Sequence, residues 1–109
     1  MKFLFVLSRD PDEYRGVREF ATTNAEALAK SNEVHFYLIE NGVFAAKKGK
    51  PEPMNVVKPL TKNGVKVYAE DVSLKVRGLV GKTEDGVKVS NMDELVDLLM
   101  EKTDRVIWY

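Results

Sequence analysis

The chain has 109 residues, its 17 basic and 17 acidic side chains cancel, and it holds no cysteine. This length fits one domain, and a hydrophobic content of 44% is enough for a modest core. The absence of cysteine excludes disulfides, thiolate metal sites and cysteine nucleophiles, and the zero net charge argues against nucleic acid or a membrane surface as a partner.

The first part of the chain predicts a strand, a long helix and a second strand. Residues 2–7 form a continuous apolar run, which is typical of a central parallel strand buried on both faces. Pro11 ends this run, an aspartate on either side of it can cap the next helix, and residues 13–30 have the apolar spacing of an amphipathic helix. Residues 33–39 predict the next strand. Its side chains alternate between one face with Val34, Phe36 and Leu38 and another with His35, Tyr37 and Ile39.

Turn signals and prolines dominate the middle of the chain. Asn41-Gly42 indicates a turn, and residues 43–46 predict a short helix after it. Residues 50–53 contain two prolines and predict an extended loop. Residues 54–63 predict another short helix, which either spans this segment or begins at Pro59 after an extended stretch.

A strand, a sharp corner and a helix are predicted between residues 64 and 79. Residues 65–69 alternate apolar and polar side chains, as a strand does, and Asp71 can then act as the N-cap of a helix. An apolar stripe at helical spacing comes next, formed by Val72, Val76 and Leu79. Gly78 lies where this helix should end.

The last part of the chain predicts a short strand, a helix and a final strand. After a loop at residues 82–86, residues 87–89 predict the fourth strand, and Ser90 or Asn91 can cap the helix after it. The predicted buried stripe of this helix consists of Met92, Leu95, Val96, Leu99 and Met100. Residues 105–109 predict a terminal strand, whose aromatic side chains pack either beneath a helix or against another subunit.

This alternation predicts an α/β fold, with a five-stranded, mostly parallel sheet and helices on both faces. In such sheets, ligands and catalytic groups gather just past the carboxyl ends of the strands. The candidate ligand-binding residues are Glu70, Asp71, Ser73 and Arg77, together with Asn41 in the turn after the second strand.

Two interpretations of the corner at residue 70 stay open. Ser73 and Arg77 lie four residues apart on one helix face, and together with the helix N-terminus they could hold an anion. Glu70 and Asp71 occupy the same helix end and compete with an anion for it. Because acidic residues are favoured in a first helical turn in any case, we favour a capped, solvated helix end without a ligand.

Other features invite functional interpretations that the pattern does not sustain. Residues 81–83 (Gly-Lys-Thr) resemble the end of a phosphate-binding loop, but position 76 holds valine where that loop needs glycine. The only histidine, His35, lies in a predicted strand, and in a chain without cysteine it favours packing with one hydrogen bond over metal binding. The basic run within residues 47–50 favours a solvated surface over an acidic partner. We therefore predict neither a metal nor a cofactor.

The segment from residue 64 to residue 79 also resembles a known family. It contains Gly-Val-x-Val at residues 64–67 and Ser-x-x-x-Arg-Gly-Leu at residues 73–79. This combination is similar to that of the DsrE/DsrF/TusD group of sulfur-relay proteins, which we call DsrE-like, and the order of the other predicted elements extends the similarity over nearly the whole chain. In many members the corner holds a cysteine eight residues before the glycine of the Arg-Gly pair. Counted back from Gly78, that position is Glu70.

The resemblance implies a flavodoxin-like, three-layer α/β/α domain. It also implies assembly into trimers, hexamers or hetero-oligomers, in which the corner cysteine accepts a persulfide. A carboxylate neither attacks sulfane sulfur as a thiolate does nor holds it covalently. We therefore expect a non-catalytic structural or regulatory subunit, paired with copies of itself or with a cysteine-bearing relative. The alternative is a protein that binds a small molecule or an anion at the corner of Glu70, Asp71 and Arg77, with or without enzymatic activity.

One compartment is expected from the sequence. No apolar run approaches the length needed to span a bilayer, and the first residues lack the cleavage site of a signal peptide. We therefore expect a cytoplasmic protein.

Overall fold

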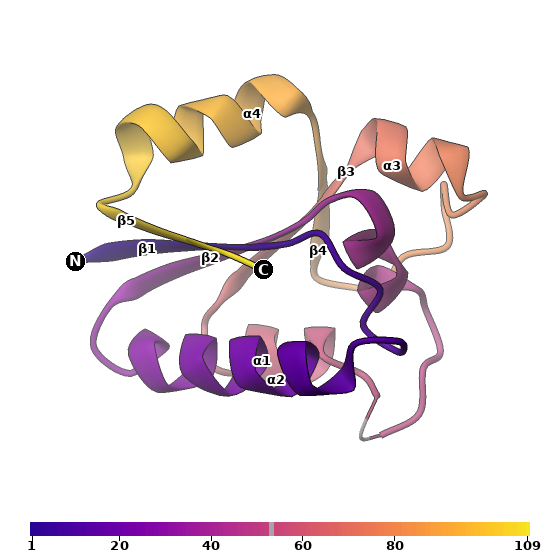
Figure 1. The fold of residues 1–109 in the computed structure, drawn as a ribbon, viewed down its shortest axis with the longest axis horizontal. Coiled ribbons are helices and arrows are strands. Elements are labelled where there is room, and N and C mark those ends of the chain that lie inside the picture. Colours follow the sequence, from indigo (N-terminus) through magenta and orange to yellow (C-terminus); the bar gives the residue numbers. More distant parts are fainter. Residues whose placement is uncertain (53) are drawn as a thin grey trace.

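A five-stranded sheet runs through the centre of the molecule (Figure 1), whose computed structural model describes residues 1–52 and 54–109. The strands lie in the order β4-β3-β2-β1-β5, and every pairing between them is parallel. The predicted α/β fold is confirmed, and these five strands form a wholly parallel sheet where we expected a mostly parallel one. The strand bounds are β1 (Lys2–Leu7), β2 (Glu33–Leu38), β3 (Lys66–Glu70), β4 (Val87–Ser90) and β5 (Arg105–Trp108).

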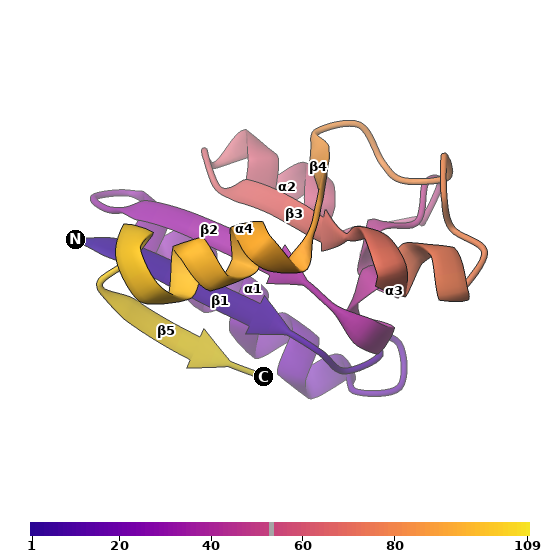
Figure 2. The ribbon, with the colours of Figure 1, turned by 90° about the horizontal axis from the view of Figure 1, so that it is seen from above.

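Helices cover both faces of this sheet, which gives three layers (Figures 1 and 2). α1 (Arg15–Ala29) and α2 (Val57–Lys62) lie on one face. The other face carries α4 (Met92–Asp97), which continues into a π-helical turn, η2 (Leu98–Lys102). The chain steps across the sheet from β1 to β4 and then returns to the opposite edge through α4, which therefore crosses over β1 in Figure 2.

Two short helices come after the carboxyl ends of the central strands. The 3-10 helix η1 (Glu40–Ala46) comes after β2, and α3 (Asp71–Val76) comes directly after β3. The two helices contact each other, because β2 and β3 are neighbours in the parallel sheet and end at the same edge. All five candidate residues lie in or beside these two helices.

The alternation of side chains along the strands divides the core into two clusters. One cluster joins Phe5 and Phe36 to residues of α1 and α2 such as Ala21 and Leu60. The other joins residues of β1 and β2 to α4; its members are Leu4, Val6, Tyr37, Ile39, Tyr68, Leu95 and Leu98. The two predicted faces of the second strand are therefore confirmed, and each face packs against its own helical layer.

The apolar stripe predicted for α3 is wrong. Val72 and Val76 are exposed, Val76 to 74% of its surface, whereas Leu74 is buried. Leu79 is buried, but it lies in the turn that closes the helix, where its N–H donates to the carbonyl of Leu74. Because α3 has only six residues, its contacts with η1 and β3 set its orientation, and its own periodicity does not.

The stripe predicted for α4 is right only in part. Leu95 is buried and Leu99 partly buried, and they face the core together with Leu98, which the predicted stripe did not include. The remaining predicted members are exposed: Met92, Val96 and Met100. The helix is apolar on two sides, so periodicity alone does not decide which side packs on the sheet.

The helix ends also differ from prediction. α1 begins at Arg15 and not at residue 13, because the Asp10 carboxylate holds the backbone N–H groups of Asp12 and Glu13 in a turn. Of the two predicted caps of α4, Asn91 is the one used, and its side chain accepts a hydrogen bond from the Glu94 N–H.

The middle of the chain keeps its predicted elements with shifted bounds. η1 begins at Glu40, three positions before the predicted helix, and α2 begins two residues before Pro59. The loop predicted at residues 50–53 includes Pro53, which lies outside the described residues. Its described part contains a turn, in which the Pro51 carbonyl accepts hydrogen bonds from the N–H groups of Met54 and Asn55.

Candidate functional site

Glu70 is the last residue of β3 and the N-cap of α3. Its backbone is extended, with φ −72° and ψ 131°, and its side chain turns back to accept hydrogen bonds from the N–H groups of Val72 (2.9 Å) and Ser73 (2.9 Å). The prediction that Asp71 caps this helix is therefore wrong. Asp71 is the exposed first residue of the helix, and its carboxylate also accepts from the Val72 N–H. Glutamate is an unusual N-cap, which is why the pattern pointed to the aspartate beside it.

Ser73 ties Glu70 to the neighbouring loop. Its buried hydroxyl donates to a Glu70 carboxylate oxygen at 2.5 Å and accepts from the N–H of Glu40 at 2.8 Å. Glu40 has φ 54°, in the left-handed region that non-glycine residues seldom adopt, so this contact anchors a strained residue. The Ser73 hydroxyl thus connects the end of β3 to the start of η1 through two hydrogen bonds.

Hydrogen bonds decide the protonation state of this corner. Burial raises the pKa of the Glu70 carboxyl, but the Ser73 hydroxyl and the two backbone N–H groups outweigh burial, so the pKa lies below its ordinary value of 4.5. Glu70 is therefore a carboxylate at neutral pH. A carboxylate with a lowered pKa is a weak general base, and the Ser73 proton already points at it, so the pair lacks the geometry of an activated nucleophile.

Arg77 and Asn41 form a second contact beside the first. The Arg77 Nε donates to the Asn41 side-chain oxygen at 2.9 Å, and one of its terminal nitrogens donates to the Ser73 carbonyl at 3.2 Å. Ser73 and Arg77 do meet, as the spacing predicts, but through the backbone of Ser73 and not through its hydroxyl. The guanidinium joins the end of α3 to η1, and these internal contacts favour a structural role for the corner.

His35 makes two hydrogen bonds, where one was predicted. Its Nδ1 lies 2.7 Å from the Tyr68 hydroxyl and its Nε2 lies 2.7 Å from a Glu33 carboxylate oxygen. Glu33 and His35 lie at the amino end of β2, whereas Tyr68 lies in the middle of β3, two residues before Glu70. The alternation of strand side chains could have placed His35 on one face with Glu33, but the contact with Tyr68 depends on the register between β2 and β3.

The part of the chain that the structure describes contains neither a metal-binding cluster nor a membrane-spanning helix. In residues 1–52 and 54–109, no three His, Cys, Asp or Glu side chains are arranged to hold a metal ion. No helix in this part of the chain is long and apolar enough to cross a bilayer.

Comparison with known proteins extends these observations. The model of the DsrE/DsrF-like family matches residues 1–109. An uncharacterised Methanocaldococcus jannaschii protein, MJ0989, is 32% identical with full coverage of both chains, and an uncharacterised Methanopyrus kandleri protein, MK0008, is 35% identical over 76% of this chain and 73% of its own.

The fold is shared with several solved structures. The ychN protein of E. coli superposes with a TM-score of 0.85 at 20% identity, covering 100% of this chain and 99% of that one. MTH1491 of Methanobacterium thermoautotrophicum, a protein of unknown function, gives a TM-score of 0.78 at 21% identity, covering 99% and 98%. The sequence motif around residue 70, the three-layer fold and the match along the whole chain agree, and this protein belongs to the DsrE/DsrF-like family.

Proposed function

We propose that this protein is a non-catalytic subunit, structural or regulatory, of an assembly related to sulfur-relay proteins. The observation that carries the proposal is the state of Glu70, at the position where the family resemblance places the sulfur-accepting cysteine. The residue is 5% exposed, and its carboxylate accepts hydrogen bonds at both oxygens. Sulfur transfer needs a soft thiolate that can form and break a bond to sulfur, and a capping carboxylate cannot do either.

The first test is whether the chain takes up sulfur. After incubation with a persulfide donor, intact mass spectrometry of the wild-type protein should detect no stable gain of sulfur. Because the chain has no cysteine, Glu70→Cys introduces a single thiol where two backbone N–H groups and the Ser73 hydroxyl converge. This variant should gain one sulfur atom.

The matched control places a thiol elsewhere. Thr23→Cys puts a single thiol on the exposed side of α1, away from the corner, and should accept sulfur more slowly than Glu70→Cys. A stable sulfur adduct on the wild-type chain would contradict the proposal. Equal rates for the two variants would mean that the corner confers no reactivity on a thiol placed there.

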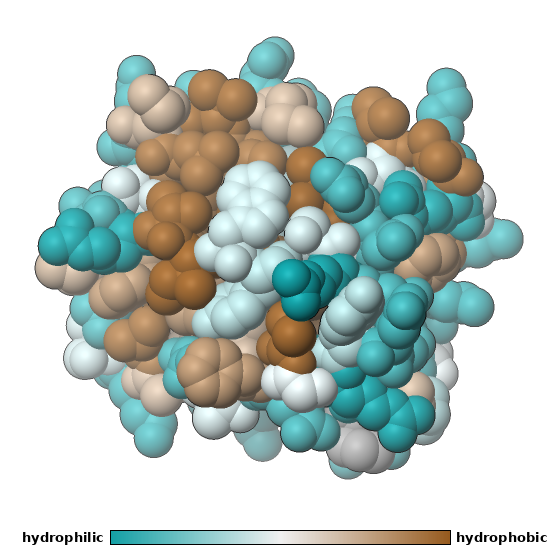
Figure 3. Space-filling model, in the orientation of Figure 1, coloured by the Kyte–Doolittle hydropathy of each residue, from teal (hydrophilic) through white to brown (hydrophobic). Residues whose placement is uncertain are grey.

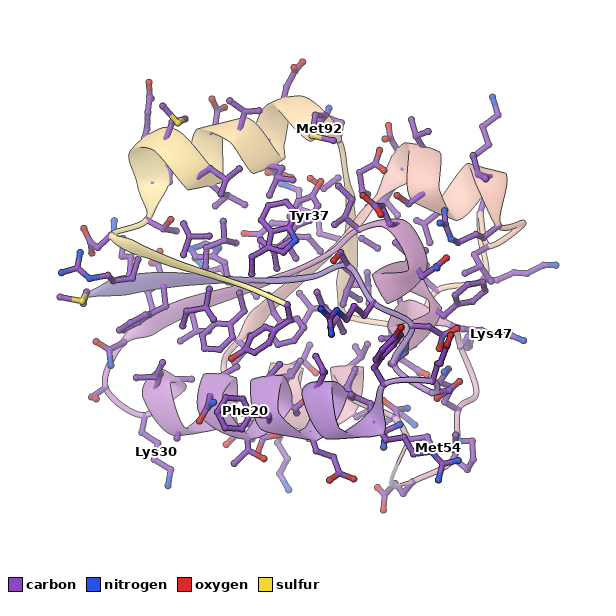
Figure 4. All side chains as sticks on the ribbon, viewed as in Figure 1. Phe20, Lys30, Tyr37, Lys47, Met54 and Met92 are labelled. Carbon is purple, nitrogen blue, oxygen red and sulfur yellow. The ribbon has the colours of Figure 1, made fainter. Side chains whose placement is uncertain are left out.

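An apolar surface around β5 supports the role of a subunit. We call it the β5 surface, and its residues are Phe20, Val96, Met100, Val106 and Trp108, all exposed. Figure 3 shows apolar side chains in a band from α4 over β5 towards α1, and Figure 4 shows Phe20 on the front of α1, on the same side as β5. Of the terminal aromatic residues, Tyr109 packs on Phe5 and Phe20, whereas Trp108 turns outward.

The backbone of β5 is also open to a partner. β5 is an edge strand, and the N–H and C=O groups of Tyr109 both bond to β1, through Val6 and Ser8. Because these groups alternate in direction along a parallel strand, those of Val106 and Trp108 point away from the sheet. An exposed apolar edge of this kind is a template for pairing with another chain. We propose a second copy of this protein as the partner, with a cysteine-bearing relative as the other outcome that the test distinguishes.

The second test measures assembly. Native mass spectrometry of protein isolated from its host, with light scattering of the purified chain, should give an oligomer. Val106→Lys, on β5, should raise its dissociation constant at least about ten-fold, because it places a charge in the buried centre of an interface. The matched control is Val89→Lys on β4, the edge strand on the other side of the sheet, where the valine is 54% exposed against 40% for Val106. A monomeric wild type would overturn the subunit role, and a stronger effect of Val89→Lys would overturn the choice of surface.

A further inference from the structure

A cavity of about 480 Å³ extends from the amino ends of β1 and β2 to the middle of β3, beside α4 and η2. Figure 2 looks onto this face of the sheet, where α4 crosses β1 and leaves parts of β2 and β3 uncovered. The cavity is polar: apart from Leu98, every residue that lines it carries a charged or hydrogen-bonding side chain. The lining residues are Lys2, Glu33, His35, Lys66, Tyr68, Glu94, Leu98, Glu101 and Lys102.

A hydrogen-bonded chain forms part of the cavity wall. Glu33, His35 and Tyr68 are joined by contacts of 2.7 Å at each imidazole nitrogen, and both His35 and Tyr68 are more than nine-tenths buried. The hydrogen bond from His35 lowers the pKa of the Glu33 carboxyl, so Glu33 is ionised at neutral pH. Burial raises the pKa of Tyr68 to about 12, so its phenol keeps its proton.

These two states fix the direction of each hydrogen bond. The Glu33 carboxylate only accepts, so the His35 Nε2 must carry a proton and donate to it. In neutral His35 the Nδ1 is then an acceptor, and the Tyr68 hydroxyl donates to it and turns only lone pairs towards its surroundings. When His35 takes up a second proton, Nδ1 becomes a donor, and the Tyr68 O–H is released to donate to a group in the cavity. Proton uptake therefore converts this part of the wall from acceptor to donor.

The charged side chains around the cavity are partly paired with one another or with neighbouring residues. Two of its glutamates are already paired, Glu33 with Lys66 at 3.7 Å and Glu94 with Lys88 at 2.7 Å. No ion pair within the described residues involves Lys2 or Lys102. Lys2 and Lys102 nevertheless help to lower the pKa values of Glu33 and Glu94, and Glu101 is the third carboxylate of the lining.

The chemistry of a ligand can be read from this balance. The cavity lining holds three lysines and three glutamates, so its formal charge is zero when His35 is neutral, and protonation of His35 makes it positive. The π-helical turn η2, which supplies Leu98, Glu101 and Lys102, is a rare element that is frequent at functional sites. We propose that this cavity binds a small oxyanion, such as sulfate, phosphate or a small carboxylate, together with one proton that His35 takes up. The cavity lining includes none of the candidate residues of the corner, so this inference stands apart from the subunit role.

Sulfate is the probe, because it keeps its charge over the pH range in which histidine titrates. Binding to the wild-type protein is measured at about pH 5.5 and about pH 7.5. Sodium chloride of equal ionic strength is the reference. Sulfate should bind about ten-fold more tightly at the lower pH, because the protonated site is the one that binds. The imidazole of the single histidine, followed by NMR, should titrate at a higher pH in sulfate than in chloride.

Two lysine variants locate the site. Lys102→Gln removes an exposed charge at the cavity, and it should weaken sulfate binding several-fold and reduce the displacement of the His35 titration. Lys62→Gln removes an exposed lysine from α2, on the other face of the sheet, and should change neither. His35→Gln should abolish the pH dependence of binding, and if it does not fold, the lysine pair still decides. Identical His35 titrations in sulfate and chloride would overturn the proposal, as would equal effects of the two lysine variants.

Discussion

Glu70 occupies the position at which the family resemblance places a sulfur-accepting cysteine. Glu70 reaches two backbone N–H groups and the Ser73 hydroxyl, and through Ser73 it steadies the strained residue Glu40. A cysteine side chain is shorter and would make fewer of these contacts, but it would be nucleophilic. The contacts seen at position 70 are therefore those of a helix cap.

Gly42 meets a second constraint at the scale of one residue. A Cβ atom added there would lie 1.9 Å from the Leu7 carbonyl oxygen and 2.8 Å from its carbon, because η1 folds back onto the end of β1. Gly42→Ala should therefore lower the free energy of unfolding by about 3 kcal/mol, since backbone atoms cannot move aside cheaply. Urea denaturation of the purified variant measures this loss.

Gly16 supplies the matched control for Gly42. A Cβ there meets nothing within 4 Å, and the residue lies in the first turn of α1. Gly16→Ala should be neutral or should raise stability by up to about 1 kcal/mol. Equal effects of the two substitutions would contradict the close approach of η1 to β1.

At the scale of elements, the two short helices beyond and above the sheet are the informative ones. Both α3 and α4 have apolar side chains on more than one side, so each has several possible buried faces. α3 is oriented by its contacts with η1 and by the Ser73 hydroxyl, and α4 by the cluster around Tyr37. The faces left over point outward, and part of the outer face of α4 belongs to the β5 surface.

The orientation of α3 can be tested directly. Leu74→Ala should lower the free energy of unfolding by about 3 kcal/mol, because it leaves a cavity among residues that are fully packed. Val76→Ala should change stability by less than about 0.5 kcal/mol, since Val76 is mostly exposed. Thermal and urea unfolding of both variants measure the difference, and a larger loss for Val76→Ala would mean that the helix packs on the face predicted from its periodicity.

At the scale of the whole molecule, three buried or hydrogen-bonded carboxyl groups have pKa values below the ordinary value. A hydrogen bond from His35 lowers the pKa of Glu33, and a hydrogen bond from Lys88 lowers that of Glu94. At Glu70 burial opposes the shift, but hydrogen bonds outweigh it and the pKa is again lowered. These groups lie on different elements, so their combined effect on the pH dependence of stability is a property of the folded state as a whole.

That property predicts acid sensitivity. A carboxyl whose pKa is lower in the folded state stabilises the fold above its ordinary pKa, and this contribution disappears as the pH falls through the folded value. Stability should therefore be retained from neutral pH down to about pH 4.5 and should decline below it. Urea midpoints across this range provide the measurement.

Two variants test whether the acid sensitivity comes from the carboxyl groups with lowered pKa values. Glu70→Gln should be less stable than wild type at neutral pH and should lose less stability on acidification, because one of the three groups is gone. Glu13→Gln, an exposed position in the turn before α1, should keep the wild-type dependence. A wild-type midpoint that does not change between neutral pH and about pH 3 would contradict the lowered pKa values.

Much of this architecture is local, and the sequence by itself determined it. The apolar run of β1, the two-sided alternation of β2 and the helical spacing of α1 each report a periodicity that depends only on backbone geometry. The motif around residue 70 likewise placed a strand, a corner and a helix within a few residues of their observed ends. The absence of a thiol is a fact of composition that no fold can alter.

Only the tertiary structure decided which groups meet and which faces are covered. Glu70 became the N-cap in place of Asp71, because Ser73 and Glu40 are brought together by helices that come after different strands. The hydrogen bonds that join Glu33, His35 and Tyr68 form because β2 and β3 pair in one particular register. The outward faces of α3 and α4 were set by the residues that pack beneath them. The physical reason is common to all three: contacts between residues distant in sequence depend on register and helix orientation, and local periodicity carries no information about either.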